Sequence, residues 1–295
     1  MDDRRPDRWT IRSVLAWTRD HLAGKGVENP RLETEWILAE ALGVDRVGLY
    51  LNFDKPLNDA ERSAIREMVS RRARREPLQY IMGSQEFAGL DFTVTPAVLI
   101  PRHDTELLLE EAASRLEGIE RVLEIGTGSG CLAISLASRF PGLSVTATDI
   151  SSAALSVARE NARRHAVTVR FLEGDLFSPV EGERFSLILS NPPYIPTTDI
   201  STLEPEVREY EPLTALDGGV DGLSCYRRLI PGALTHLTPG GWFLVEIGIG
   251  EGEGVRELFA SSRFCDIVTA VDTAGRERVV IGRAPTEKDG SSWTS

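Results

Sequence analysis

The feature that most constrains the fold of this 295-residue chain is an alternation of strand-like and helix-like segments that begins at residue 120. Short apolar runs recur there, and amphipathic stretches such as residues 152–165 separate the first several of them. The expected strands are Arg121–Ile125, Ser144–Thr148, Thr168–Leu172, Phe185–Ser190, Gly241–Ile247, Arg263–Ala270 and Glu277–Arg283. This alternation predicts the α/β class, with a mostly parallel, Rossmann-like sheet of seven strands and helices on both faces.

The last two expected strands require a different connection. Only the turn around Asp272 to Gly275 joins them. A parallel crossover needs about a dozen residues, so a link this short permits only an antiparallel pair. We therefore expect the last strand of the sheet to run antiparallel.

The region before residue 77 is predicted to be helical. Thr10, Asn29 and Asn58 stand where helix caps are expected, and Asn29 is followed by a proline, which is favoured at the first helical position. Gly24 and Gly43 stand where helices would end. We expect a small N-terminal helical domain that docks the substrate.

Three further boundaries follow from changes in pattern along the chain. The stretch EFAGLDFTVTP has two short runs of alternating apolar residues around a glycine, which predicts a β-hairpin. The polar end of the chain is expected to be disordered. The expected organisation is a helical domain at 1–76, a β-hairpin linker at 77–101, the α/β domain at 102–284 and a disordered tail at 285–295.

Arginine is concentrated near the end of the helical region. Six arginines lie within fourteen positions: Arg62, Arg66, Arg71, Arg72, Arg74 and Arg75. Cations near a helix C-terminus usually form a solvated face, which is the interpretation we favour. The alternative is a docking surface for a partner protein or RNA.

The segment VLEIGTGSGCLAISLA (residues 122–137) reads as a strand, a glycine-rich turn and a helix. Glycine occupies every second position of the turn, where it lets the backbone take positive φ and approach a ligand closely. A dinucleotide fingerprint has its third glycine one place later, where this chain has Cys131. The pattern, preceded by Glu124, instead favours S-adenosylmethionine, which lacks a pyrophosphate. The expected cofactor residues of the turn are Gly126, Thr127, Gly128, Ser129 and Gly130.

Two later segments extend the expected cofactor site. Asp149 stands at the carboxyl end of the second strand, where an acidic side chain can accept hydrogen bonds from both ribose hydroxyls. Asp175 and Leu176 follow the third strand. We expect the Asp175 carboxylate to bind the adenine amino group and Leu176 to pack on the adenine ring.

The fourth strand runs into Asn191-Pro192-Pro193-Tyr194. The two prolines stop the strand, and ligands of open α/β sheets bind at the carboxyl ends of strands, so Asn191 should lie near the cofactor's methyl group. The Asn191 side-chain carbonyl and the Pro192 backbone carbonyl can each accept one N–H of a planar –NH2 group. Two such acceptors orient the amine and stabilise its developing positive charge. Tyr194 can pack on the planar group or on the methyl.

These residues define the expected chemistry of the site. Methyl transfer to such a nitrogen needs no strong base, because the proton becomes acidic once the methyl has arrived. The expected catalytic residues are Asn191, Pro192 and Tyr194; Asn191 also contacts the cofactor, and the acceptor is expected to bind to Asn191, Pro192, Pro193 and Tyr194.

Composition excludes several other classes of protein. The net charge of −12 opposes stable nucleic-acid binding, whose affinity comes from neutralising phosphates. Three widely spaced cysteines favour a reducing cytoplasm and neither a disulfide framework nor a zinc site. The four histidines show no ligand spacing, so no metal is expected. No signal peptide or membrane span is expected either.

The motifs taken together resemble the release factor glutamine methyltransferases, the PrmC/HemK family of S-adenosylmethionine-dependent enzymes. The likeness covers nearly all of residues 76–283. It is carried by EPLQYIMGSQEFAGLDFTVTPAVLIPRHDTELLLE, VLEIGTGSGCLAISLA, GDLF, SNPPYI, EPLTALDGG, DGLSCYRRLI and GRERVV. Two positions depart from the family pattern: His103 replaces a proline, and Glu251 stands where glutamine is frequent.

The resemblance implies a methyltransferase sheet and a specific reaction. Members of the family methylate the side-chain amide nitrogen (N5) of the glutamine in the Gly-Gly-Gln loop of class 1 peptide chain release factors, leaving S-adenosylhomocysteine. The resemblance further implies cofactor contacts at Gly126–Gly130, Asp149, Leu176 and Asn191, and glutamine contacts at Asn191–Tyr194.

An alternative function stays open at this point, because an adenine or cytosine amino group is also a planar –NH2. The alternative is an N-methyltransferase that acts on the exocyclic amino group of a nucleic-acid base. The arginine cluster favours it. Three considerations oppose it: the negative net charge, the absence of an inserted base-recognition domain, and the need to flip a base out of a duplex. A non-catalytic binding module is opposed by the intact glycine turn, Asp149 and Asn191.

Overall fold

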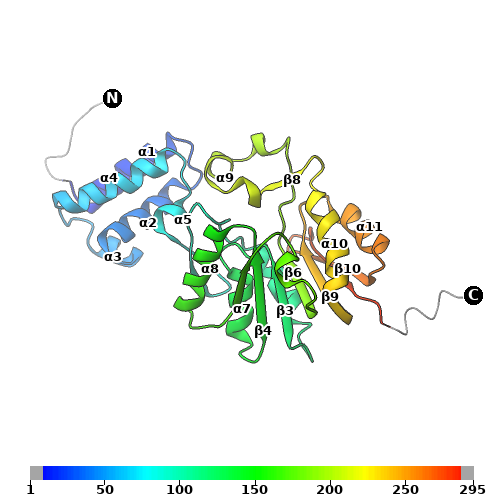
Figure 1. Ribbon diagram of the computed structural model, residues 1–295. Coiled ribbons are helices and arrows are strands. Elements are labelled where there is room, and N and C mark those ends of the chain that lie inside the picture. The colour runs from blue at the N-terminus through cyan, green and yellow to red at the C-terminus, as the bar shows by residue number, and fades with distance from the viewer. Residues whose placement is uncertain (1–8, 287–295) are drawn as a thin grey trace, which may run out of the picture. The chain divides into compact units, whose positions relative to one another are not determined.

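A computed structural model of the chain describes residues 9–286, which form two compact units (Figure 1). The first unit contains residues 9–83 together with the later segment Glu204–Tyr210. The second unit contains Ser84–Leu203 and residues 211–286. Most of the tail for which disorder was expected lies outside the described residues.

The first unit is helical, as expected. Its helices are α1 (Ile11–Ala23), α2 (Pro30–Leu42), α3 (Arg46–Leu51), α4 (Asp59–Ala73), α5 (Leu78–Met82) and α9 (Pro205–Tyr210). Thr10 and Asn58 each form a capping box with the residue three positions later, so both predicted caps are confirmed. Asn29 makes no side-chain cap bond, and the proline that follows it starts α2. Apolar side chains of α1, α2 and α4 form one core around Leu22, Ile37 and Leu38.

The extent of the helical unit differs from the boundary expected at residue 76. Helix α5 continues it to Gly83, where the chain turns with φ of 76°. The segment Glu204–Tyr210 also belongs to it, although it lies more than a hundred residues further along the chain. Sequence pattern gives no sign of this, because the segment is short and polar and its partners are distant.

The second unit contains the predicted seven-stranded sheet. Its strands are β3 (Arg121–Ile125), β4 (Ser144–Asp149), β5 (Arg170–Glu173), β6 (Phe185–Ser190), β9 (Leu237–Glu246), β10 (Cys265–Val271) and β11 (Glu277–Arg283). Their spatial order is β10-β11-β9-β6-β3-β4-β5. Strand β11 is antiparallel to both neighbours, while β5, β4, β3, β6 and β9 are mutually parallel. The mostly parallel sheet with an antiparallel last strand is thus confirmed.

Helices cover both faces of this sheet (Figure 1). They are α6 (Thr105–Ala113), α7 (Cys131–Arg139), α8 (Ser152–Arg164), α10 (Ser224–His236) and α11 (Gly252–Ser261), with short 3-10 turns at η1 (Ser178–Val180), η2 (Ile200–Thr202) and η3 (Leu213–Ala215). Successive strand residues point to opposite faces. Leu187 and Leu189 therefore pack in the core under α6 and α7, whereas Ile188 packs in the core under α10 and α11.

Two smaller strand pairs complete the second unit. Strands β7 (Ile195–Pro196) and β8 (Asp217–Gly219) pair in parallel. The expected hairpin is formed by β1 (Ser84–Phe87) and β2 (Leu90–Thr93), which pair antiparallel. Phe87 and Phe92 are fully buried in the core of the second unit, so the hairpin is part of that unit's packing.

No helix between residues 9 and 286 combines the length and the apolar character needed to cross a membrane.

Candidate active site

A cavity of about 510 Å³ lies at the carboxyl ends of the adjacent parallel strands β6, β3 and β4. Side chains that end parallel strands meet at one edge of the sheet, which is where ligands of open α/β folds bind. The cavity wall includes nearly all of the predicted site residues: Gly126, Thr127, Gly128, Ser129, Asp149, Asp175, Leu176, Asn191, Pro192 and Pro193. The fold thus brings together residues that lie up to 67 positions apart (126 to 193).

The glycine turn adopts a backbone that other residues resist. Gly126, Gly128 and Gly130 have φ of 75°, 55° and 83°. Gly130 caps α7, and a Cβ there would lie 2.8 Å from Ile134 Cδ1 and 3.2 Å from Ala158 Cβ. Gly130 is therefore required for its φ and for close helix packing, rather than for the cavity wall itself.

Hydrogen bonds fix the turn against its surroundings. The Gly126 and Thr127 N–H groups both donate to the Thr148 carbonyl of β4, at 2.9 and 3.0 Å. On the other side, the Asn161 amide donates to the Ser129 carbonyl at 2.9 Å and to the Thr93 carbonyl of β2 at 3.0 Å. Asn161 thereby ties the hairpin to the turn.

A buried carboxyl group stabilises the glycine turn by accepting hydrogen bonds. Glu124 Oε2 accepts hydrogen bonds from Thr127 Oγ1 at 2.6 Å and from the Ala133 N–H at 3.1 Å. Burial raises the pKa of Glu124 to about 8, against the opposing effect of these two donors. Glu124, the acidic residue before the turn, therefore has a structural role: it stabilises the turn through these hydrogen bonds.

The predicted ribose and adenine residues also lie at the cavity. Asp149 Oδ2 accepts from the Gly128 N–H at 2.9 Å, and Oδ1 accepts from the Ser151 N–H at 2.8 Å. These bonds hold the carboxylate in place and leave further lone pairs, since a carboxylate offers about four. Asp175 forms an ion pair with Arg228 of α10. Leu176 lines the cavity in a left-handed conformation, with φ of 49°.

The amide of Asn191 is oriented by a residue of α6. Asn191 Nδ2 donates to Thr105 Oγ1 at 3.1 Å, and Thr105 is 3% exposed. In this orientation the amide nitrogen faces Thr105, and Oδ1 is left as an acceptor. Thr105 lies within the segment PRHDTELLLE, but sequence reasoning did not select it, because its contact with Asn191 spans 86 positions.

A second buried carboxyl lies next to Asn191 and Thr105. Glu246 ends β9 and is 2% exposed, and its Oε2 atom has no hydrogen-bond partner among the described residues. Burial raises its pKa to about 7; hydrogen bonding by Thr105 and Asn191 opposes this shift, and the charge of Asp104 adds to it. Sequence reasoning missed Glu246, since an acidic residue at a strand end is common.

Tyr194 is placed differently from the other predicted site residues. It is not among the described residues that line the cavity. Its ring packs against the core under α10 and α11, and its Cδ2 atom lies so close to Gly248 that a Cβ there would be 3.0 Å away. Burial raises the pKa of its hydroxyl. A contact between Tyr194 and the acceptor stays a prediction.

The two departures from the family pattern have different surroundings. His103 is exposed and lies 3.1 Å from Glu106 Oε1 through its Nδ1 atom. Glu251 Oε2 accepts the Gly248 N–H at 2.9 Å, and burial raises the pKa of Glu251 to about 7. The contact with the Gly248 N–H needs only an oxygen acceptor, which a glutamine side chain would also supply.

Models of known protein families match two stretches of the chain. The PrmC N-terminal domain matches residues 13–83, and the methyltransferase small domain matches residues 103–203. The first match ends where the structure ends the continuous part of the helical unit, at Gly83. The second covers β3 through β7 and therefore the glycine turn and Asn191–Tyr194.

Individual relatives extend these matches over nearly the whole chain. A release factor glutamine methyltransferase of Geobacter sulfurreducens is 58% identical over 95% of this chain and 98% of its own length. One of Moorella thermoacetica is 44% identical over 91% of this chain and 96% of its own. A methyltransferase structure from Pyrococcus furiosus has a TM-score of 0.53 at 23% identity, covering 73% of this chain and 98% of its own, which shows a shared fold.

Proposed function

This chain belongs to the family of release factor glutamine methyltransferases, and we propose that it transfers the methyl group of S-adenosylmethionine to the glutamine side-chain amide nitrogen in the Gly-Gly-Gln motif of class 1 release factors. One observation carries the proposal. A single cavity joins the glycine turn, Asp149 and Asn191–Pro193, so that a cofactor and an amide acceptor can meet at the end of β6.

The residues of the cavity fit S-adenosylmethionine. The carboxylates of Asp149 and Asp175 supply acceptors for ribose hydroxyls and an amino group, and Leu176 supplies an apolar surface for a ring. The turn of Gly126–Gly130 allows close backbone approach, and no pyrophosphate-binding third glycine is needed for this ligand. When bound, the cofactor supplies an electrophilic methyl group on a sulfonium.

The acceptor is held by Asn191 and Pro192 in this proposal. Thr105 directs the Asn191 amide nitrogen away from the acceptor, so Oδ1 accepts one glutamine N–H and the Pro192 carbonyl accepts the other. As the nitrogen bonds to the methyl carbon and the bond from that carbon to sulfur breaks, leaving S-adenosylhomocysteine, positive charge develops on the nitrogen and strengthens both hydrogen bonds. Solvent takes the proton that is then released. Pro193 keeps this backbone rigid, and Tyr194 supports it from the core side.

The alternative, methylation of a nucleic-acid base, is not favoured. The curated relatives that cover the chain are named for release factors. The arginines that supported nucleic-acid binding are largely engaged with carboxylates: Arg62, Arg71, Arg72 and Arg75 each form an ion pair within the helical unit. We infer that the helical unit docks the release factor, which supports a protein substrate.

The test is methyl mapping with two competing substrates. The purified protein is incubated with isotopically labelled S-adenosylmethionine and either a class 1 release factor or duplex DNA, and the label is located by mass spectrometry. We expect label only on the glutamine of Gly-Gly-Gln. A release factor with alanine in place of that glutamine is the matched control. Label on DNA, or on another residue of the factor, would contradict the proposal.

A further inference from the structure

The segment Glu204–Tyr210 leaves the second unit and packs as part of the helical unit. Along the chain it lies between two stretches that line the cavity. Asn191–Pro193 precede it, and Pro212–Ala215 and Asp217 follow it. The segment is therefore the part of the chain that connects two cavity-lining stretches, and it belongs to the helical unit.

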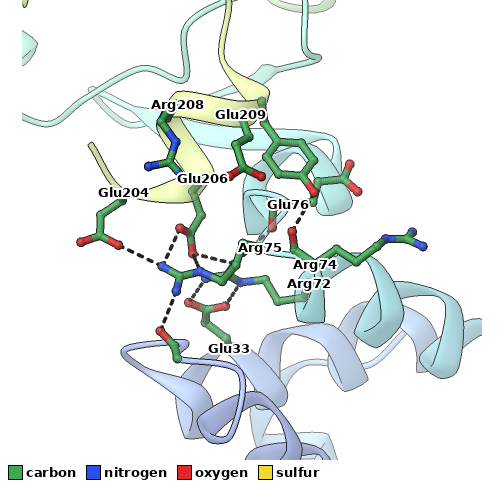
Figure 2. A network of polar contacts seen from close by, with 11 residues as sticks. Glu33, Arg72, Arg74, Arg75, Glu76, Glu204, Glu206, Arg208 and Glu209 are labelled. Carbon is green, nitrogen blue, oxygen red and sulfur yellow. Dashed lines mark hydrogen bonds and ion pairs between the residues drawn. The ribbon is translucent and has the colours of Figure 1, made fainter. Parts of the chain in front are cut away.

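Glu206 fixes the segment through two arginines of the cluster that sequence analysis singled out. Its carboxylate is bound in a fork by Arg75, with Nε to Oε1 and Nη2 to Oε2 both at 2.6 Å. Arg72 Nη1 lies 2.8 Å from Oε1 of the same carboxylate. Figure 2 shows both guanidinium groups directed at Glu206 from the end of α4. Bidentate arginine–carboxylate pairs combine strength with defined geometry.

The two arginines are themselves held by other parts of the helical unit (Figure 2). Arg72 also pairs with Glu33 of α2. Arg75 Nη1 donates to the Gly26 carbonyl at 3.0 Å, between α1 and α2, and Arg75 Nη2 donates to Glu204 Oε2 at 3.0 Å. The far end of the segment is tied by the Tyr210 hydroxyl, which donates to the Arg74 carbonyl at 2.8 Å.

This network differs from ordinary surface ion pairs because one of its arginines is buried. Arg72 is only 5% exposed, so the expectation of a solvated arginine face is wrong for this residue. Burial alone would raise the pKa of Glu206, but its hydrogen bonds with Arg75 and Arg72 prevail and lower that pKa. A buried guanidinium is stable only when it is paired, so the native helical unit requires a carboxylate near Arg72.

The chain is fixed again as soon as it re-enters the second unit. Glu211 is 6% exposed, and its Oε2 atom accepts the Ile100 N–H at 3.2 Å. Its other oxygen pairs with Arg102, which lines the cavity. Glu206 and Glu211 thus hold the chain on both sides of Tyr210, one in each unit.

We propose that Glu206, held by Arg72 and Arg75, is a positioning residue that fixes the segment Glu204–Tyr210 within the helical unit, so that this segment stays ordered when a protein substrate binds. The role in substrate binding rests on the proposed function, whereas the restraint itself does not. A released segment would have to be ordered again on each binding event, at a cost in conformational entropy.

Hydrogen exchange measures the restraint without any substrate. We compare the full-length protein with Glu206→Ala and with Glu206→Gln, which keeps the shape of the side chain and loses its charge. The amides of Val207 and Arg208 both donate to the Glu204 carbonyl at 3.0 Å, and they should exchange at least about tenfold faster in Glu206→Ala, with a smaller effect in Glu206→Gln. The matched control is Glu209→Ala, because Glu209 lies on the same helix and its side chain is 52% exposed. Exchange at wild-type rates in both Glu206 variants would overturn the proposal.

Kinetics with the release factor then test the functional part. We expect the KM for the release factor to rise about tenfold in Glu206→Ala, with the Kd for S-adenosylmethionine and the kcat at saturation nearly unchanged. Faster exchange with an unaltered KM would refute the positioning role. If the wild-type protein does not methylate the factor at all, the proposed function fails, but the exchange data still decide whether Glu206 restrains the segment.

Discussion

The buried carboxyl of Glu246 makes a quantitative prediction about stability and pH. Its pKa is raised from an ordinary value of 4.5 to about 7, chiefly by burial beside Thr105 and Asn191. Because the folded state holds its proton more tightly than the unfolded state, the contribution of Glu246 to stability is complete below pH 4.5. That contribution is lost as the pH rises through about 7.

The perturbation is Glu246→Gln, which keeps the side-chain shape and cannot ionise. One pKa unit corresponds to about 1.4 kcal/mol, so the shift of Glu246 costs the wild-type protein about 1 kcal/mol at pH 5 and about 3 kcal/mol at pH 8. Any effect of the introduced amide on the free energy of unfolding that does not depend on pH is the same at pH 5 and pH 8. We therefore expect the stability of the variant relative to wild type to increase by about 2 kcal/mol or more between pH 5 and pH 8.

The assay must isolate the second unit, since two units need not unfold together. Urea unfolding is followed at pH 5 and pH 8 by hydrogen exchange of the amides in β6 and β9, which lie in the middle of the sheet. The matched control is Glu257→Gln, a substitution of an exposed residue on α11, which should change stability equally at both pH values. An advantage of Glu246→Gln that does not grow with pH would refute the assigned cause of the shift.

Three further substitutions test the cavity and the glycine turn beside it. Asn191→Ala should lower kcat for methylation by ~10²–10³ while the Kd for S-adenosylmethionine, measured by calorimetry, changes less; near-normal turnover would exclude the role of its carbonyl. Asp149→Ala should weaken cofactor binding about tenfold or more in the same calorimetry, and unchanged affinity would show that the carboxylate serves the turn alone. Gly130→Ala should destabilise the second unit by about 2 kcal/mol in urea unfolding, because its Cβ would lie 2.8 Å from Ile134 Cδ1 at positive φ; a neutral effect would mean that α7 shifts freely.

The alternation of segments was sufficient to predict the sheet. Strands β3, β6 and β11 begin and end at the predicted residues, because in a buried strand most residues on both faces are apolar and turn residues bound the run. The antiparallel last strand followed from the length of one turn. The glycine turn and Asn191–Pro193 could also be predicted, since strand order and parallel direction bring their ends to one cavity.

What the sequence alone determined is therefore local or periodic: the helical caps, the strands, the order of strand and helix, and the residues that end parallel strands. The tertiary structure alone decided three other matters. It placed Thr105 against Asn191, paired Arg228 with Asp175, and joined Glu206 to Arg72 and Arg75. Each of these contacts joins side chains at least 53 positions apart, and a single charged or hydroxyl residue carries no periodic signal of its partner. Which distant side chains come into contact depends on how the helices and strands pack around the cores. The sequence pattern predicts that a core forms, but it does not specify which polar groups meet at the edge of that core.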